Sequence, residues 1–432
     1  MFIASINAAI GILWNCILWY LKAMDIKVAL LYLWCIYLTY LLRVPKRKCT
    51  CGAKPPVLVQ DLDLAEDILT SSSLCSRSGP NQRLVQAFDI DNAFTTLDFG
   101  TYHEFVSRTK DLLHRPDPSI ASIIQPMRRS ALEEALIIRL KKSVPVLPLV
   151  QVFCFRFVLL KFFASSCVDT SPTLSILRIT QLINSLWIAS KRSCSPNLPD
   201  FVIMKKELQR ELGLLFSYSE DEKENPLNIL LPTYETLWRV VFRCFLEVSF
   251  RNPSHITEWK GLFERFLENP TPRQFSERKG RSAVQDIVKE SLRLYPPTRR
   301  IYRQEAEDSA LFAIDVEYLQ RMEEVWGADG KSFRPERWGI LEAAGNASYK
   351  RAWMPFGKGS FDCPARKLAP MMIGVLVGIL IQSFGGGEWI LDGRKRSVLN
   401  EKPLENGRGA MEGLTIRKIE TQDREHGDGQ MD

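Results

Sequence analysis

Hydrophobic positions in this chain recur mainly at three- and four-residue intervals, the spacing that places apolar side chains on one face of an α-helix. Alternating patterns are few and short, and they predict strands at 57–59, 300–302 and 413–418. The helical spacing predicts helices at 129–142, 150–165, 173–190, 202–216, 228–250, 257–268, 280–294 and 367–383. We therefore expect a fold that is mainly α with small β-sheets.

The amino-terminal end is strongly apolar. Residues 2–21 carry no charged side chain and are long enough to cross a bilayer as one helix, and residues 28–42 form a second, shorter run. The basic stretch RVPKRK at 43–48 follows, and the positive-inside rule would keep it in the cytosol. We expect residues 1–45 to form an uncleaved membrane anchor of one or two helices, and the number of crossings stays open.

The rest of the chain shows no internal repeat and no obvious linker, so we expect one large domain over 46–420 and a flexible polar tail over 421–432. The net charge of +7 is scattered and forms no dense basic stripe, which argues against nucleic-acid binding. Ten cysteines in 432 residues do not make a disulfide scaffold.

The strongest candidate for chemistry is the segment MPFGKGSFDCPARKLAP at 354–370. Phe356, Gly357 and Gly359 make a tight loop with few side chains, and Cys363 follows just before a helical run. Glycines let a backbone pass close to a flat ligand, and amides at a helix start can stabilise a thiolate. The pattern predicts a haem-ligating Cys363, and the alternative is a buried structural cysteine.

A second pattern combines charges on a helix with a distant arginine. Glu290 and Arg293 stand one turn apart in KESLRLYPP, and FRPERW supplies Arg337 as a third member. A charge network is one interpretation, and a solvated surface bridge is the other.

The third pattern is LLPTYETLWRVVF at 230–242, where Glu235 and Thr236 follow Pro232 in an otherwise apolar helix. A proline inside a helix frees a carbonyl, which leaves room for a small molecule or water. An acid and an alcohol side by side at such an opening could relay protons.

In order and spacing these motifs resemble the cytochrome P-450 superfamily, and more closely its membrane-bound fungal members. The matching stretches are PTYETL, ESLR, FRPERW and FGKGSFDCPA. The similarity is specific over 228–420 and loose over 57–227. It implies a cytochrome P-450-like fold and haem b, with Cys363 as the axial ligand in the loop that contains Phe356, Gly357 and Gly359.

The resemblance also implies roles for other residues. Glu235 and Thr236 would deliver protons to iron-bound oxygen. Arg303, with Arg300 as a lesser candidate, would reach a haem propionate. The network of Glu290, Arg293 and Arg337 would lock the fold behind the cysteine loop.

The implied activity is a haem-thiolate monooxygenase at the endoplasmic reticulum membrane, with its catalytic domain facing the cytosol. Such an enzyme takes electrons from an NADPH-dependent cytochrome reductase and inserts one oxygen atom from O2 into a lipophilic substrate.

Three departures from the family pattern leave a second hypothesis open, a truncated or inactive relative that serves as a membrane-bound binding or scaffold protein. Phe361 stands two residues before Cys363, where the family usually has a basic residue that binds a propionate. The segment after the anchor is shorter than in the family. No Trp-x-x-x-Arg helix is evident, and the segment 97–116 offers only His103 or Arg108 in its place.

Overall fold

The computed structural model describes residues 55–116, 118–139, 142–163, 172–192, 199–216, 225–306, 309–345, 347–385, 388–392 and 402–419. The expected membrane anchor and the expected polar tail lie outside these residues. Among the residues described, no helix combines the length and the apolar character that crossing a bilayer requires.

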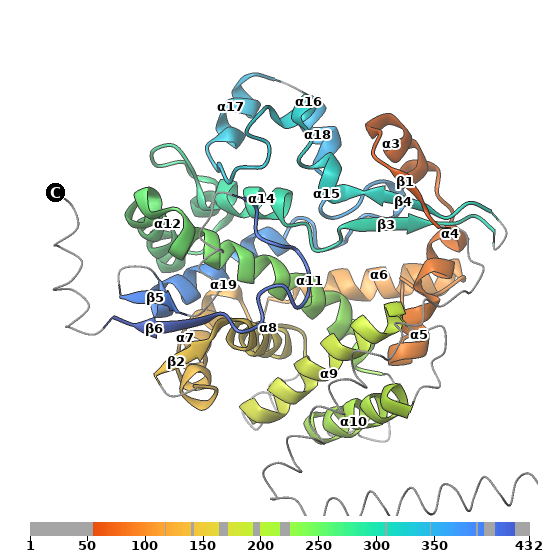
Figure 1. Ribbon diagram of the computed structural model, residues 1–432, viewed down its shortest axis with the longest axis horizontal. Helices are drawn as coiled ribbons and strands as arrows, with labels where there is room; N and C mark the ends of the chain where they lie inside the picture. Colours follow the sequence, from red (N-terminus) through yellow and green to blue (C-terminus); the bar gives the residue numbers. More distant parts are fainter. Residues whose placement is uncertain are drawn as a thin grey trace, which may run out of the picture. The chain divides into compact units, whose positions relative to one another are not determined.

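A set of long apolar helices forms the core. Helix α8 (Val146–Phe162) is apolar apart from Gln151, Arg156 and Lys161, and it lies buried against α7 (Ile120–Ile137), α9 (Thr173–Arg192) and α11 (Leu227–Leu246). Helix α19 (Ala369–Phe384) packs on α11 and α7 and is even more apolar, since it contains no charged residue. Figure 1 shows α11 and α19 crossing the centre of the molecule.

Two small sheets flank this helical core on opposite sides (Figure 1). One has the order β1 (Val57–Val59), β4 (Phe312–Asp315), β3 (Arg300–Arg303), with β1 parallel and β3 antiparallel to β4. The other is fully antiparallel, in the order β2 (Ser143–Pro145), β6 (Thr415–Lys418), β5 (Trp389–Asp392).

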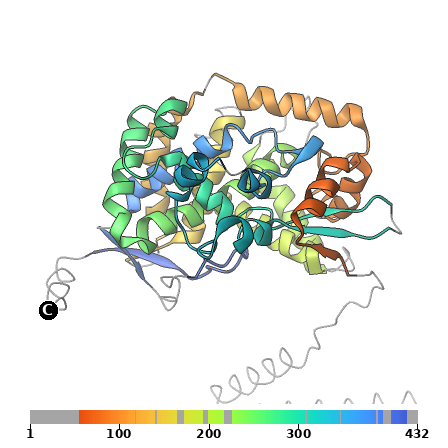
Figure 2. The same cartoon turned by 90° about the horizontal axis from the view of Figure 1, so that it is seen from above.

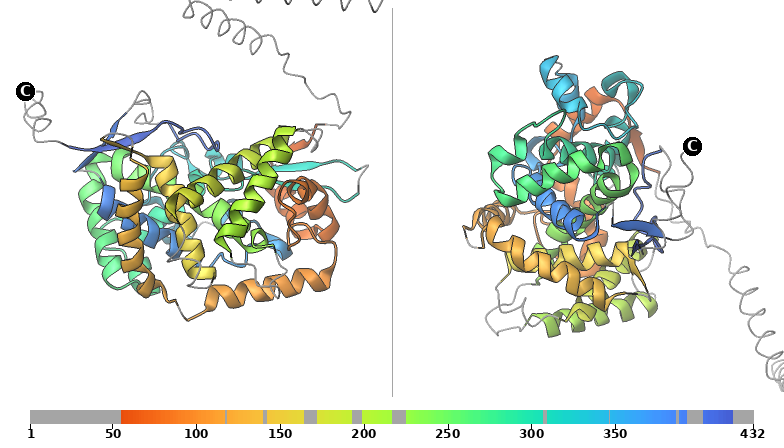
Figure 3. Two further views of the ribbon diagram at one scale, coloured as in Figure 1. Left: turned by 90° about the horizontal axis from the view of Figure 1, so that it is seen from below. Right: turned by 90° about the vertical axis from the view of Figure 1, so that its left-hand side faces the viewer.

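The other described elements complete the fold, with α12 and α14 contributing to the core and α6 running along one edge of it (Figures 2 and 3). They are α3 (Leu62–Ser71), α4 (Leu74–Ser78), η1 (Gly79–Asn81), α5 (Gln82–Phe88), α6 (Phe99–His114), α10 (Pro199–Leu215), η3 (Glu247–Arg251), η4 (Pro253–His255), α12 (Ile256–Glu268), α13 (Pro272–Ser276), α14 (Val284–Leu294), α15 (Val316–Leu319), α16 (Glu323–Trp326), α17 (Arg337–Ala343), α18 (Ser348–Ala352) and η5 (Gly359–Phe361).

The expectation of a mainly α fold with small β-sheets is confirmed, and several element boundaries differ from the sequence pattern. The helix expected at 129–142 begins at Ile120, because the Ser119 hydroxyl accepts the amide of Ser122 and caps it. The helix expected at 280–294 begins at Val284, where the Asp286 carboxylate accepts the amide of Ala283.

Candidate functional site

The loop before Cys363 is bent by its glycines. Gly357 and Gly359 have φ angles of +74° and +76°, which side chains with a Cβ rarely adopt. A Cβ on Gly359 would lie 2.5 Å from the carbonyl oxygen of Leu69 in α3, so only glycine fits there. The Cys363 amide closes the loop by donating to the Phe356 carbonyl at 2.9 Å.

The loop is also held from outside by charge and by aromatic packing. Lys358 forms an ion pair with Glu66 of α3 at 2.7 Å. The Phe356 ring meets Trp353 edge to face at a centroid distance of 6.1 Å, and Trp353 meets Trp338 in the same way at 5.7 Å. These contacts fix the position from which Cys363 projects.

The Cys363 side chain is half-buried, and burial raises the pKa of its thiol. The neighbouring Asp362 carboxylate adds to this rise, whereas a hydrogen bond from the Ala365 amide and the charge of Arg77 lower the pKa. A metal cation that replaced the thiol proton would bind Cys363 as a thiolate. The amide of Ala365 would stabilise the negative sulfur.

Glu290, Arg293 and Arg337 come together in one buried network. Arg293 donates two hydrogen bonds to the Glu290 carboxylate at 2.8 and 2.7 Å, and Arg337 Nε donates to Glu290 Oε1 at 2.9 Å. Burial alone would raise the pKa of Glu290, but the two guanidinium groups outweigh it and lower the pKa. The interpretation as a solvated surface bridge is wrong, because Glu290 and Arg293 have no exposed surface.

Gln320 connects this network to the cysteine loop. Its Nε2 donates to the carbonyls of Leu292 and Arg293 at 3.0 and 2.9 Å, and its Oε1 accepts the Met354 amide at 2.9 Å. The residue is completely buried, so none of these groups has water as an alternative partner. Sequence reasoning missed Gln320, since a single glutamine in 315–333 belongs to no recognisable pattern.

The proline in α11 does not leave the opening that the sequence suggested. Pro232 has no amide hydrogen, so the carbonyl of Asn228 has no partner within the helix. That carbonyl accepts a hydrogen bond from Asn92 Nδ2 at 3.2 Å. The expectation of room for a small molecule at the freed carbonyl is therefore wrong, because a side chain from another segment takes the place.

Thr236 and Glu235 lie in different surroundings. Thr236 is the only exposed residue between Leu227 and Ser249, and its hydroxyl donates to the Pro232 carbonyl at 3.2 Å. Glu235 is buried and forms an ion pair with Arg408. Neighbouring residues on a helix point about 100° apart, and no hydrogen bond joins these two side chains. They are adjacent but do not form a direct proton relay.

The two arginines of β3 point to opposite faces of the strand, as the period of two requires. Arg303 is buried, and it donates to the Ser72 hydroxyl at 3.1 Å. Arg300 is exposed and lies 3.6 Å from the Asp315 carboxylate. Arg300 therefore does not share a site with Arg303. The alternation of side chains along a strand could have shown from the sequence that the two candidates point to opposite faces.

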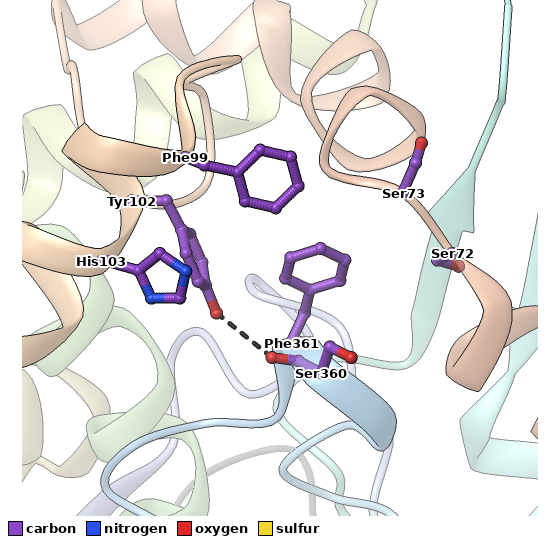
Figure 4. A pocket seen from close by; sticks show the side chains of 7 residues that line it. All are labelled: Ser72, Ser73, Phe99, Tyr102, His103, Ser360 and Phe361. Atoms are coloured by element: carbon purple, nitrogen blue, oxygen red, sulfur yellow. Dashed lines mark hydrogen bonds between the residues drawn. The ribbon is translucent and has the colours of Figure 1, made fainter.

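A pocket of about 330 Å³ lies between α6, the turn after α3 and the cysteine loop. Phe99, Tyr102 and His103 come from α6 and face Phe361, and the Tyr102 hydroxyl donates to the Ser360 carbonyl at 3.3 Å (Figure 4). His103 thus lies beside the loop, as one of the two weak candidates on this segment. The other, Arg108, is exposed and does not line the pocket.

These residues fit a haem group. The Cys363 sulfur lies at the end of the bent loop and accepts a hydrogen bond from a backbone amide. Gly359 has no side chain, and this allows the loop to lie close against α3. Arg303 is buried, and no carboxylate of the described chain lies within ion-pair distance of it. A ligand with a metal for the sulfur and an acidic group for the arginine would satisfy both.

Comparison with known proteins points the same way. Residues 263–388 match the family model described as cytochrome P450. Cytochrome P450-like protein L532 of Acanthamoeba polyphaga mimivirus is 27% identical over 201 residues, covering 43% of this chain and 39% of that protein. Cytochrome P450 monooxygenase claQ of Ampulloclitocybe clavipes is 26% identical over 238 residues, covering 47% and 44%. The chain thus spans less than half the length of these relatives.

Solved structures share the fold over most of the chain. A six-coordinated cytochrome P450 from Thermus thermophilus has a TM-score of 0.53 at 18% identity, and the match covers 85% of this chain and 93% of that one. The protein CYP175A1, from another strain of the same bacterium, has a TM-score of 0.55 at 19% identity, with 84% and 89% covered. At this identity the likeness concerns the fold.

Proposed function

We propose that this chain, which belongs to the cytochrome P450 superfamily, is a haem-thiolate monooxygenase that acts on a lipophilic organic substrate. The observation that carries the proposal is Cys363, half-buried at the end of a loop that two glycines at positive φ bend back on itself. Haem b bound through this sulfur would supply the activation of O2 and the transfer of one oxygen atom.

The remaining site residues have distinct tasks in this proposal. Glu290, Arg293 and Arg337, through Gln320, hold the start of the cysteine loop at Met354. Their burial without solvent partners makes this support rigid. Cys363 is thereby kept in one orientation when the cofactor binds.

Thr236 is the residue we assign to proton handling. Its hydroxyl is the exposed polar group in the middle of a buried helix, and it can hold or pass a proton at Oγ1. Glu235 forms an ion pair with Arg408, so it would take part in proton transfer only after that pair opens. We therefore rank Thr236 ahead of Glu235.

The electrons would come from NADPH through a separate cytochrome reductase. The decisive experiment supplies the purified full chain with haem, reductase and NADPH under ¹⁸O2, together with a panel of lipophilic compounds that perturb the haem spectrum. One ¹⁸O atom in the product, and none after Cys363→Ala, is expected. Thiolate-ligated haem without any reductase-dependent NADPH oxidation would instead favour an inactive, scaffold-like relative.

We also propose that residues 1–45 attach the protein to the endoplasmic reticulum membrane, with the catalytic domain in the cytosol. The uncharged run at 2–21 and the basic stretch at 43–48 support this placement. The full chain should stay with membranes after alkaline extraction, whereas a variant lacking residues 1–45 should be released. Release of the full chain would contradict the anchor.

A further inference from the structure

Arg77 in α4 is a buried cation that pairs with no acidic side chain among the described residues. Only 8% of its surface is exposed, and within the described part of the chain no carboxylate lies at ion-pair distance. Its guanidinium carbon lies over three aromatic rings instead, at 4.6 Å from the centroid of Phe94, 5.3 Å from Phe361 and 5.8 Å from Tyr102.

The position of Arg77 relates it directly to the cysteine loop. Phe361, over whose ring the Arg77 guanidinium lies, stands two residues before Cys363. The rings of Phe361 and Tyr102 also line the pocket in Figure 4. Arg77 therefore lies against the wall of that pocket.

Arg303 borders the same pocket through its hydrogen bond to Ser72, another lining residue. Burial lowers the pKa of Arg303 to about 10, and the charge of Arg77 contributes to the shift. Two buried guanidinium groups that repel each other are costly unless an anion lies near both. The pocket and its two cations thus suit a ligand with carboxylate groups.

We propose that Arg77 binds a propionate carboxylate of the haem, and so supplies from α4 the positive charge that Phe361 removes from the cysteine loop. The inference rests on the proposed function, since it assumes haem at Cys363. A guanidinium can donate two parallel hydrogen bonds to one carboxylate. The three aromatic rings limit the rotation of Arg77, and Arg303 is placed to serve the second propionate.

The alternative is that Arg77 only clamps the aromatic rings together. Replacing the propionates rather than the protein distinguishes the two roles. We would measure the affinity of the apoprotein for haem and for haem dimethyl ester, whose propionates carry no charge. The preference for haem over the ester then reports on the cations that contact the carboxylates.

We expect Arg77→Gln to lower this preference about 10- to 100-fold, as for one lost hydrogen-bonded charge pair. Arg77→Met should do the same, and its aliphatic chain still covers the rings if the glutamine variant does not fold. Phe361→Arg in the Arg77→Gln background should restore the preference. The matched control is Arg83→Gln, because Arg83 lies over Trp187 at 5.3 Å and does not contact Phe361.

Unchanged preference in Arg77→Gln and Arg77→Met would overturn the inference and leave Arg77 as a clamp. If Phe361→Arg did not restore the preference for haem in the Arg77→Gln background, this would contradict the inference that the two positions serve the same propionate. Failure of the folded wild-type chain to bind haem through a thiolate would be a different result, since it would reject the proposed function itself.

Discussion

Replacing Gln320 tests how the buried network supports the cysteine loop. Gln320→Met keeps a side chain of similar length and volume but removes all three hydrogen bonds. The carbonyls of Leu292 and Arg293 and the amide of Met354 would then be buried without partners. The Met354 amide matters most for function, because it begins the loop that ends at Cys363.

The expected loss of stability follows from those groups. A buried polar group left without its hydrogen bond costs about 1–3 kcal/mol. Because the penalties of neighbouring groups do not add fully, we expect the free energy of unfolding to fall by about 3–5 kcal/mol for the three groups together. We also expect the variant to release haem faster than the wild type.

Urea unfolding and the transfer of haem to an excess of a haem-binding apoglobin would measure the two effects. The matched control is Gln60→Met, since Gln60 is exposed and makes only a 3.5 Å contact with Asp315. The control should change the free energy of unfolding by less than about 0.5 kcal/mol. A Gln320→Met variant as stable as this control would refute the assigned support role.

Three further predictions concern the proton-handling alcohol, the buried acid and the bent loop. Thr236→Ala should keep haem but release more peroxide for each NADPH oxidised, and an unchanged ratio of product to NADPH would remove Thr236 from the reaction. Folding lowers the pKa of Glu290 below its usual value of 4.5. The ionised Glu290 therefore contributes its full stabilisation above pH 4.5, and this stabilisation is lost as the pH falls through the lower pKa of the folded state. Unfolding free energies between pH 7 and 3 should therefore fall less in Glu290→Gln than in the wild type, and parallel curves would contradict this. Gly359→Ala should reduce the yield of haem-loaded protein because its Cβ would meet Leu69, whereas normal loading would show that the loop can move aside.

Local sequence patterns predicted much of the fold and part of the candidate site. The apolar periodicity located the core helices α8, α11 and α19 to within a few residues, because each buries a wide face. The cysteine loop was recognisable from its glycines, because the backbone freedom of a glycine is a local property that needs no contact with a distant segment.

Contacts between distant segments could not be predicted from the sequence. Arg77 and Phe361 lie far apart along the chain, and so do Glu235 and its partner Arg408. Helix α6 was missed because its polar face is wide and only three of its residues are buried.

Ligation of haem iron by the Cys363 thiolate is the central claim, and the reduced carbon monoxide spectrum tests it most directly. The folded full chain, supplied with haem, should show the red-shifted absorbance band of a thiolate-ligated haem, and Cys363→Ala should abolish it. A wild-type protein that binds haem without this band, or a band that persists in Cys363→Ala, would contradict the claim.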